Sequence, residues 1–233
     1  MKIIVILFFS MLLALPTYGQ NRETDYLSHV LEKMNAVESV TYHCVKKAWE
    51  PGDKEPVYSV PTEIYEHVNP QDTAVGYSFL CASDKEFRQP LWVYDGTVFA
   101  YIEKEEKEVR IDDFTQKSPL PFRVIMPQAF GCMKSILEYV LNTQDSIVLS
   151  LKDEGKDYLM ELSIHTPYQV EFFGKACYMP QNPYIYDPTS IYKIWISKEN
   201  DMPYRYRREM QHSISEGSCS DFVYNPYGKG IIV

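Results

Sequence analysis

Hydrophobic residues first recur at helical spacing and then alternate with polar ones, and this change of period predicts a helix followed by a β region. Between Thr24 and Met34 the apolar positions fall three and four residues apart with charged residues between them, which is typical of an amphipathic helix. From Val40 to Cys44 the period becomes two, in a stretch of β-branched and aromatic residues. We therefore expect the N-terminal helix to lead directly into a strand.

Further segments show the same alternation and are separated by polar turns. Asp95 and Gly96 lie between two aromatic-rich runs, and these residue types supply the positive φ that a tight hairpin turn needs. The acidic run Glu103 to Glu106 predicts the next turn. The expected strands are Pro61 to Val68, Val75 to Cys81, Leu91 to Tyr94, Val98 to Ile102, Lys107 to Ile111, Ile147 to Leu151, Tyr158 to Ile164, Tyr168 to Cys177, Ile191 to Ser197, Tyr204 to His212 and Ser218 to Tyr224.

A second helical pattern interrupts these strands near the middle of the chain. Between Pro127 and Asn142 the apolar residues form one face at helical spacing. Strands and helices do not alternate repeatedly, which disfavours a parallel doubly wound sheet. The pattern predicts an α+β fold that is mainly antiparallel β, in one domain without internal repeats.

The first residues form a separate pattern that predicts an export signal. After one lysine, an uncharged apolar run extends from Ile3 to Leu15 and ends before Pro16. The run has 13 residues, whereas a membrane-spanning helix needs roughly 20, so a cleaved signal peptide is favoured over a retained anchor. We expect residues 1–19 to be the signal peptide, residues 20–233 to form the single domain, and the mature protein to be periplasmic, without an integral membrane span.

Charge and cysteine content narrow the possible partners. The formal net charge is −9, and without a basic cluster such a chain cannot neutralise phosphates, so nucleic acid is excluded as a partner. The five cysteines are Cys44, Cys81, Cys132, Cys177 and Cys219. Their number is odd, and their spacing does not choose among the fifteen ways of forming two disulfides. The absence of a C-x-x-C motif removes the usual basis for thiol-disulfide catalysis.

The sequence contains no recognisable catalytic motif, and we expect no catalytic residue, metal or cofactor. The five histidines lack the spacing of a metal site, and neither a G-x-S-x-G elbow nor a phosphate-binding glycine loop occurs. Ser190 and Lys193 match S-x-x-K. That chemistry needs both side chains on one face of a helix, whereas the surrounding pattern is a strand, so we interpret the match as chance.

Aromatic residues are the informative part of the composition. The chain holds 19 Tyr, 11 Phe and 3 Trp, many of them on expected strands. A curved sheet with apolar inner residues can enclose a cavity for acyl chains, although aromatic rings also dominate ordinary cores. The candidate ligand-binding residues are Tyr42, Phe79, Trp92, Tyr94, Phe99, Tyr101, Trp195 and Tyr206.

Three motifs in this order resemble a known family. They are SVTYHCVKKAW, then PLWVYDGTVFAYIEKEEKEVRI, and finally IYKIWISKENDMPYRYRREM. The Y-D-G-x-x-x-x-Y hairpin from Tyr94 to Tyr101 and the strand-turn from Trp195 to Pro203 are similar to motifs of the periplasmic lipoprotein carriers LolA and LolB. The resemblance covers about residues 22–225. The chain also resembles the domain that precedes a TlpA-like thioredoxin domain in some exported bacterial proteins.

The resemblance implies an incomplete antiparallel barrel of about eleven strands, wrapped around the N-terminal and mid-chain helices, whose inner surface shelters acyl chains. The first hypothesis is therefore a non-catalytic carrier of a lipid, a lipoprotein acyl chain or another hydrophobic ligand. The alternative is an envelope adapter that works with a separate thioredoxin-like reductase. An enzyme is the third hypothesis, and no motif supports it.

Overall fold

The structure is a computed structural model that describes residues 18–73, 75–114, 129–165, 170–172, 175–177 and 187–226. Most of the predicted signal peptide lies outside the described residues, so its cleavage stays a prediction. Most of the segment from Met179 to Pro188, which the sequence predicts to be a proline-rich loop, also lies outside the described residues.

Eleven strands form one antiparallel sheet in the order β6-β5-β4-β3-β2-β1-β13-β12-β11-β8-β7. The sheet does not close, because β6 and β7 stay at opposite edges. This arrangement confirms the predicted α+β fold and the incomplete barrel. The strands are β1 (Ser39–Trp49), β2 (Tyr58–Val68), β3 (Tyr77–Ala82), β4 (Pro90–Tyr94), β5 (Val98–Glu103), β6 (Glu108–Asp113), β7 (Ile147–Asp153), β8 (Asp157–His165), β11 (Thr189–Ser197), β12 (Met202–Met210) and β13 (Ser213–Tyr224).

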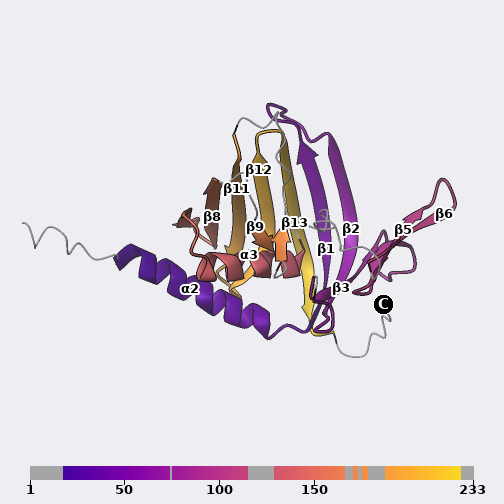
Figure 1. Ribbon diagram of the computed structural model, residues 1–233, viewed down its shortest axis with the longest axis horizontal. Coiled ribbons are helices and arrows are strands. Elements are labelled where there is room, and N and C mark those ends of the chain that lie inside the picture. The colour runs from indigo at the N-terminus through magenta and orange to yellow at the C-terminus, as the bar shows by residue number, and fades with distance from the viewer. Residues whose placement is uncertain are drawn as a thin grey trace, which may run out of the picture.

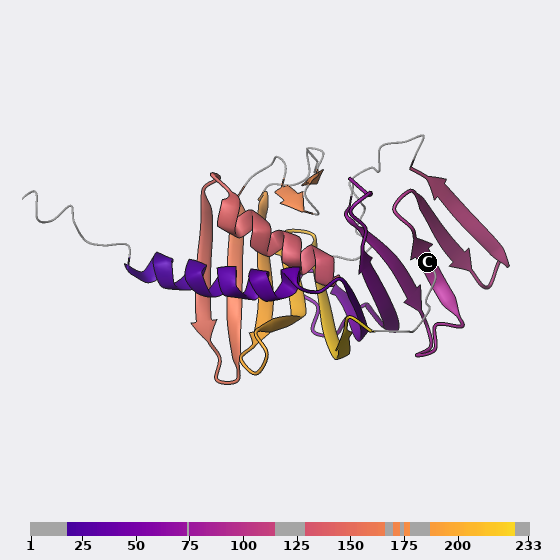
Figure 2. The ribbon, with the colours of Figure 1, turned by 90° about the horizontal axis from the view of Figure 1, so that it is seen from below.

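Two helices pack on the same face of this sheet, which we call the inner face. They are α2 (Tyr18–Asn35) and α3 (Phe130–Asn142), at the positions that the helical patterns predict. Figure 2 shows both helices crossing in front of β7, β8, β11, β12 and β13, while β4, β5 and β6 lie to one side of them. The helices also cross near one end of the strands, so β1, β2, β12 and β13 extend well beyond them (Figure 1).

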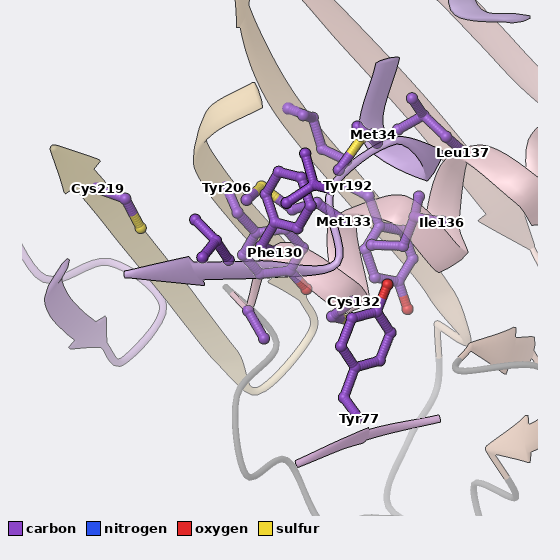
Figure 3. Packing of buried hydrophobic residues seen from close by; sticks show 14 of the residues in the cluster. Met34, Tyr77, Phe130, Cys132, Met133, Ile136, Leu137, Tyr192, Tyr206 and Cys219 are labelled. Atoms are coloured by element: carbon purple, nitrogen blue, oxygen red, sulfur yellow. The ribbon is translucent and has the colours of Figure 1, made fainter. Parts of the chain in front are cut away.

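The core forms where the helical stripes meet the inward residues of the strands. Leu27 and Met34 of α2, Ile136 of α3 and Ile194 of β11 are all completely buried, and Figure 3 shows how closely such side chains pack. Removing one large apolar side chain from water stabilises a fold by about 1.5–3 kcal/mol. The apolar spacing of three and four residues in the helices and of two residues in the strands therefore decides which face of each element turns towards the core.

The expected strand from Tyr168 to Cys177 is wrong. The chain instead forms two short strands, β9 (Val170–Phe172) and β10 (Lys175–Cys177), which pair with each other apart from the main sheet. β9 contacts α3, so this small hairpin lies over the helix rather than extending the sheet.

A carboxylate from the sheet holds the N-terminus of α3. Ala129 at the N-cap position supplies no side-chain acceptor, so the first N–H groups of the helix need another partner. The backbone N–H groups of Phe130 and Gly131 donate to Glu66 of β2 at 2.7 and 2.9 Å, and the Tyr42 hydroxyl donates to the same carboxylate. Glu66 thus ties the helix to the two central strands and places its charge at the positive end of the helix dipole.

Burial decides the ionisation of this group. Glu66 is only 1% exposed, and this burial raises its pKa to about 7, although its three hydrogen-bond donors act in the opposite direction. Burial, followed by the nearby Glu66 charge, raises the pKa of the Tyr42 hydroxyl, which therefore remains a donor. Glycine is required beside this contact, because a Cβ on Gly131 would lie 2.7 Å from the Tyr77 ring.

We expect Glu66 to lower the stability of the fold as the pH rises from 4.5 to about 7. In this window the folded state retains the carboxyl proton that the unfolded chain has lost, so unfolding becomes more favourable with rising pH. The full shift is worth about 3 kcal/mol from this group alone. Urea unfolding at about pH 5 and about pH 8 measures the pH dependence of stability.

The matched variants are Glu66→Gln and Glu105→Gln, the second in the exposed turn between β5 and β6. Glu66→Gln should lose this part of the pH dependence. At about pH 5 it should also be less stable than the unmodified protein by about 1–3 kcal/mol, because its NH₂ group cannot accept a backbone N–H, and this deficit should disappear at about pH 8, where the unmodified protein has lost its own contribution from Glu66. An unchanged pH dependence in Glu66→Gln would contradict the assignment.

Strand pairing also brings two cysteines together. Cys44 of β1 and Cys219 of β13 are direct register partners, and their sulfur atoms lie 3.1 Å apart. Opposed residues of antiparallel strands have Cα atoms about 4.5–5.5 Å apart, within the range of a disulfide. Cys81 is separated from Cys44 by β2, so two inter-strand spacings, roughly 9–10 Å, hold these residues too far apart to pair.

We expect Cys44 and Cys219 to form a disulfide when the protein refolds with oxidised glutathione, whose own disulfide is reduced to two thiols in the exchange. Mass spectrometry of unreduced peptides should find this bond. Cys44→Ser should abolish it, whereas Cys81→Ser should leave it intact. Detection of Cys219 bonded to a different cysteine in the unmodified sequence would refute the expected pairing.

Candidate ligand-binding face

Aromatic side chains line the part of the inner face that lies to one side of α2 and α3. Strand register places Trp92 opposite Tyr101, and Phe79 opposite Tyr94, so these rings share one face. On β2, Tyr58 is opposite Ala48, in the same inward series as Tyr42. We call Tyr58, Phe79, Trp92, Phe99 and Tyr101 the aromatic strip.

The aromatic strip runs from the core to the solvent. Phe79 is buried, and its ring centre lies 6.5 Å from that of Trp92, which in turn lies 5.9 Å from that of Phe99. Tyr58 and Tyr101 are 40% and 43% exposed. The strip therefore joins the hydrophobic core to apolar surface that a ligand can cover.

Seven of the eight candidate residues lie on the inner face, but they have different surroundings. Tyr42 and Tyr206 are 2% exposed and belong to the core. Tyr94 is completely buried, and its hydroxyl donates to Asp72 at 2.9 Å. Within the candidate set, Trp92, Phe99 and Tyr101 retain exposed surface.

Trp195 lies on the opposite face of the sheet, which we call the outer face. Its neighbours Ile194 and Ile196 are completely buried on the inner face, so the alternation turns Trp195 outward. The Arg205 guanidinium sits 4.2 Å from the centre of its ring, and its indole N–H donates to Glu154 at 3.1 Å. The structure thus separates Trp195 from the aromatic strip.

Sequence inspection missed a polar group on the inner face. Lys46 follows Val40, Tyr42 and Cys44 in the inward series of β1, so continuing the alternation two residues further would have found it. Its ammonium group lies 5.8 Å from the centre of the Tyr58 ring. Burial lowers the pKa of Lys46. The aromatic strip therefore ends beside a partly buried amine.

Several other chemistries can be assessed within the described residues. No group of three or more His, Cys, Asp or Glu side chains is placed to hold a metal ion there. Ser190 and Lys193 lie on β11, where a separation of three residues turns their side chains to opposite faces. None of the described helices is long and apolar enough to span a bilayer.

No protein-family model and no curated protein matches the chain. Solved structures similar to it include LprF from Mycobacterium bovis, with 10% identity over 87% of this chain and 93% of that one and a TM-score of 0.44. The lipoprotein LppX from Mycobacterium tuberculosis has 9% identity, coverage of 87% and 95%, and a TM-score of 0.43.

A LolA superfamily protein from Nitrosomonas europaea has 10% identity, coverage of 84% and 92%, and a TM-score of 0.31.

Proposed function

We propose that the chain is an exported, non-catalytic protein that binds or carries a hydrophobic ligand, such as a lipid or the acyl chain of a lipoprotein, on its inner face. The observation that supports this most is the aromatic strip, which continues the core into exposed apolar surface on an open, curved sheet. A ligand lying there would add to the existing hydrophobic core and would not need a separate apolar core of its own.

The energetics of such a site are sufficient for a carrier. Each methylene group removed from water contributes about 0.8 kcal/mol. About ten methylenes therefore supply roughly 8 kcal/mol, near the value for micromolar binding before the cost of immobilising the chain.

Export is the part of the proposal that depends on the N-terminal sequence. The predicted cleavage after Gly19 lies at the beginning of α2 (Tyr18–Asn35), so removal of residues 1–19 would leave the buried stripe of the helix intact. An adapter that works with a thioredoxin-like reductase receives less support, because the four cysteines with described side chains are all buried. Thiol exchange needs access to the attacked sulfur.

We expect the mature protein to bind acylated fluorescent probes and to copurify with lipid, which mass spectrometry of an organic extract would detect. Trp92→Ala should weaken probe binding about five- to tenfold, because an apolar contact worth about 1 kcal/mol is lost. Trp195→Ala is the matched control on the outer face and should bind the probe like the unmodified protein. Absence of both copurified lipid and probe binding would refute the carrier function.

A further inference from the structure

A second set of side chains meets at the end of the inner face that lies away from the helices. In Figure 1 the C-terminal end of β1 and the hairpin between β12 and β13 lie together, above the level of α2 and α3. Across this region Ala48 of β1 is opposite Ser215 of β13, and Ser215 is opposite Arg208 of β12. Lys46 precedes Ala48 by two residues on the same face of β1.

These positions are close enough for one small ligand to contact several side chains. Directly opposed residues have Cβ atoms about 4.5–5.5 Å apart, and diagonal neighbours such as Lys46 and Ser215 about 7–8 Å, within reach of long side chains. Arg208 lies on β12, next to β13, and the register turns its side chain to the same face as Lys46. Its positive charge acts with burial to lower the pKa of Lys46.

The cations of the outer face are arranged differently. Arg205 and Arg207 lie 3.0 and 3.2 Å from Glu216, and Arg207 also lies 2.7 Å from Glu209. Lys193 is 3.1 Å from the same Glu209. These three outward cations thus have carboxylate partners.

Lys46 has no such partner within 4.0 Å among the described side chains. The buried Glu66 of the inner face pairs in register with Val40, six residues before Lys46, so it lies roughly 20 Å away along the strand. Withdrawing an amine from water without an anion is unfavourable. The surroundings of Lys46 therefore favour the arrival of a negatively charged group.

Ser215 supplies an independent observation. Its hydroxyl oxygen is buried and has no hydrogen-bond partner among the residues that the structure describes. Buried hydroxyl groups are nearly always hydrogen-bonded, and a hydroxyl can donate to an anionic oxygen. A donor without an acceptor thus lies directly opposite one cation and diagonal to the other.

We propose that Lys46, Arg208 and Ser215 bind the anionic head group, a carboxylate or a phosphate, of an amphiphilic ligand whose apolar part lies on the aromatic strip. This rests on the proposed function and narrows the ligand to anionic lipids. Tyr58 connects the two parts, because its ring lies beside Lys46 and its hydroxyl is within electrostatic range of Tyr101. The apolar chain would run from Tyr58 towards Trp92.

The test compares palmitic acid with hexadecanol, which has the same chain but no charge, and measures the affinity of each by displacement of a fluorescent acyl probe. The acid should bind about tenfold or more tightly than the alcohol, since charge-assisted hydrogen bonds exceed neutral ones. Lys46→Met should remove most of this preference while leaving hexadecanol binding unchanged. Ser215→Ala should lower the affinity for the acid by about threefold to tenfold.

Lys47→Met is the matched control, because Lys47 is the next residue of β1 and points to the outer face. It should bind both ligands like the unmodified protein. Urea unfolding checks that each variant retains its fold.

The outcomes separate this site from the proposed function. Equal binding of the acid and the alcohol would overturn the head-group site while leaving the carrier function standing. Binding of neither ligand would remove both. Inorganic phosphate or acetate that binds as tightly as palmitic acid would show a site for free anions and overturn the assignment to a lipid head group.

Discussion

The buried contact between Glu66 and the N-terminus of α3 is the constraint on which the arrangement of the molecule depends. Without a local capping residue, the helix takes its acceptor from β2 and is thereby fixed across the two central strands. The contact combines hydrogen bonds with the helix dipole inside the core, where polar interactions are strong and their loss is costly. It also uses a carboxyl whose burial brings its pKa to about 7, so its charge state changes near neutral pH.

The position of this contact determines which part of the sheet remains available. α3 begins at Glu66 and crosses the same side of the sheet as α2, which leaves β4 and β5, the strands of Trp92, Phe99 and Tyr101, to one side of both helices. The strands also extend beyond the helices, and the region of Lys46 and Ser215 lies on that extension. The aromatic strip and the region of Lys46 and Ser215 thus both depend on where the two helices cross the sheet.

The two faces of the sheet differ in how their polar side chains are paired. On the outer face, Arg205 and Arg207 pair with carboxylates at hydrogen-bonding distance, and Arg205 also covers Trp195. On the inner face, the aromatic strip lies partly exposed, and Ser215 has a hydroxyl without an acceptor among the described residues. A buried polar group without a partner lowers the stability of the protein alone, and a ligand that supplies the partner recovers that free energy.

The sequence by itself determined the elements and their faces. Local periodicity predicted the two helices and the strands of the main sheet. Burying one face of a helix or strand requires apolar residues at a fixed spacing, and this spacing is visible within each segment of the sequence. It also identified the hairpin at Asp95 and Gly96, where Gly96 has a φ of 106°. Seven of the eight aromatic candidates lie on the inner face, and their role in ligand binding stays a prediction.

Only the tertiary structure decided which elements become neighbours. The pairing of β1 with β13 brings Cys44 to Cys219 and Lys46 near Ser215, across more than 160 residues of chain. The contact of Glu66 with α3 likewise joins residues 64 positions apart. Such contacts depend on the summed packing of the whole sheet rather than on local propensity, so no pattern within one segment records them. The same packing gave Glu66, an ordinary acid in the sequence, its buried place at the centre of the fold.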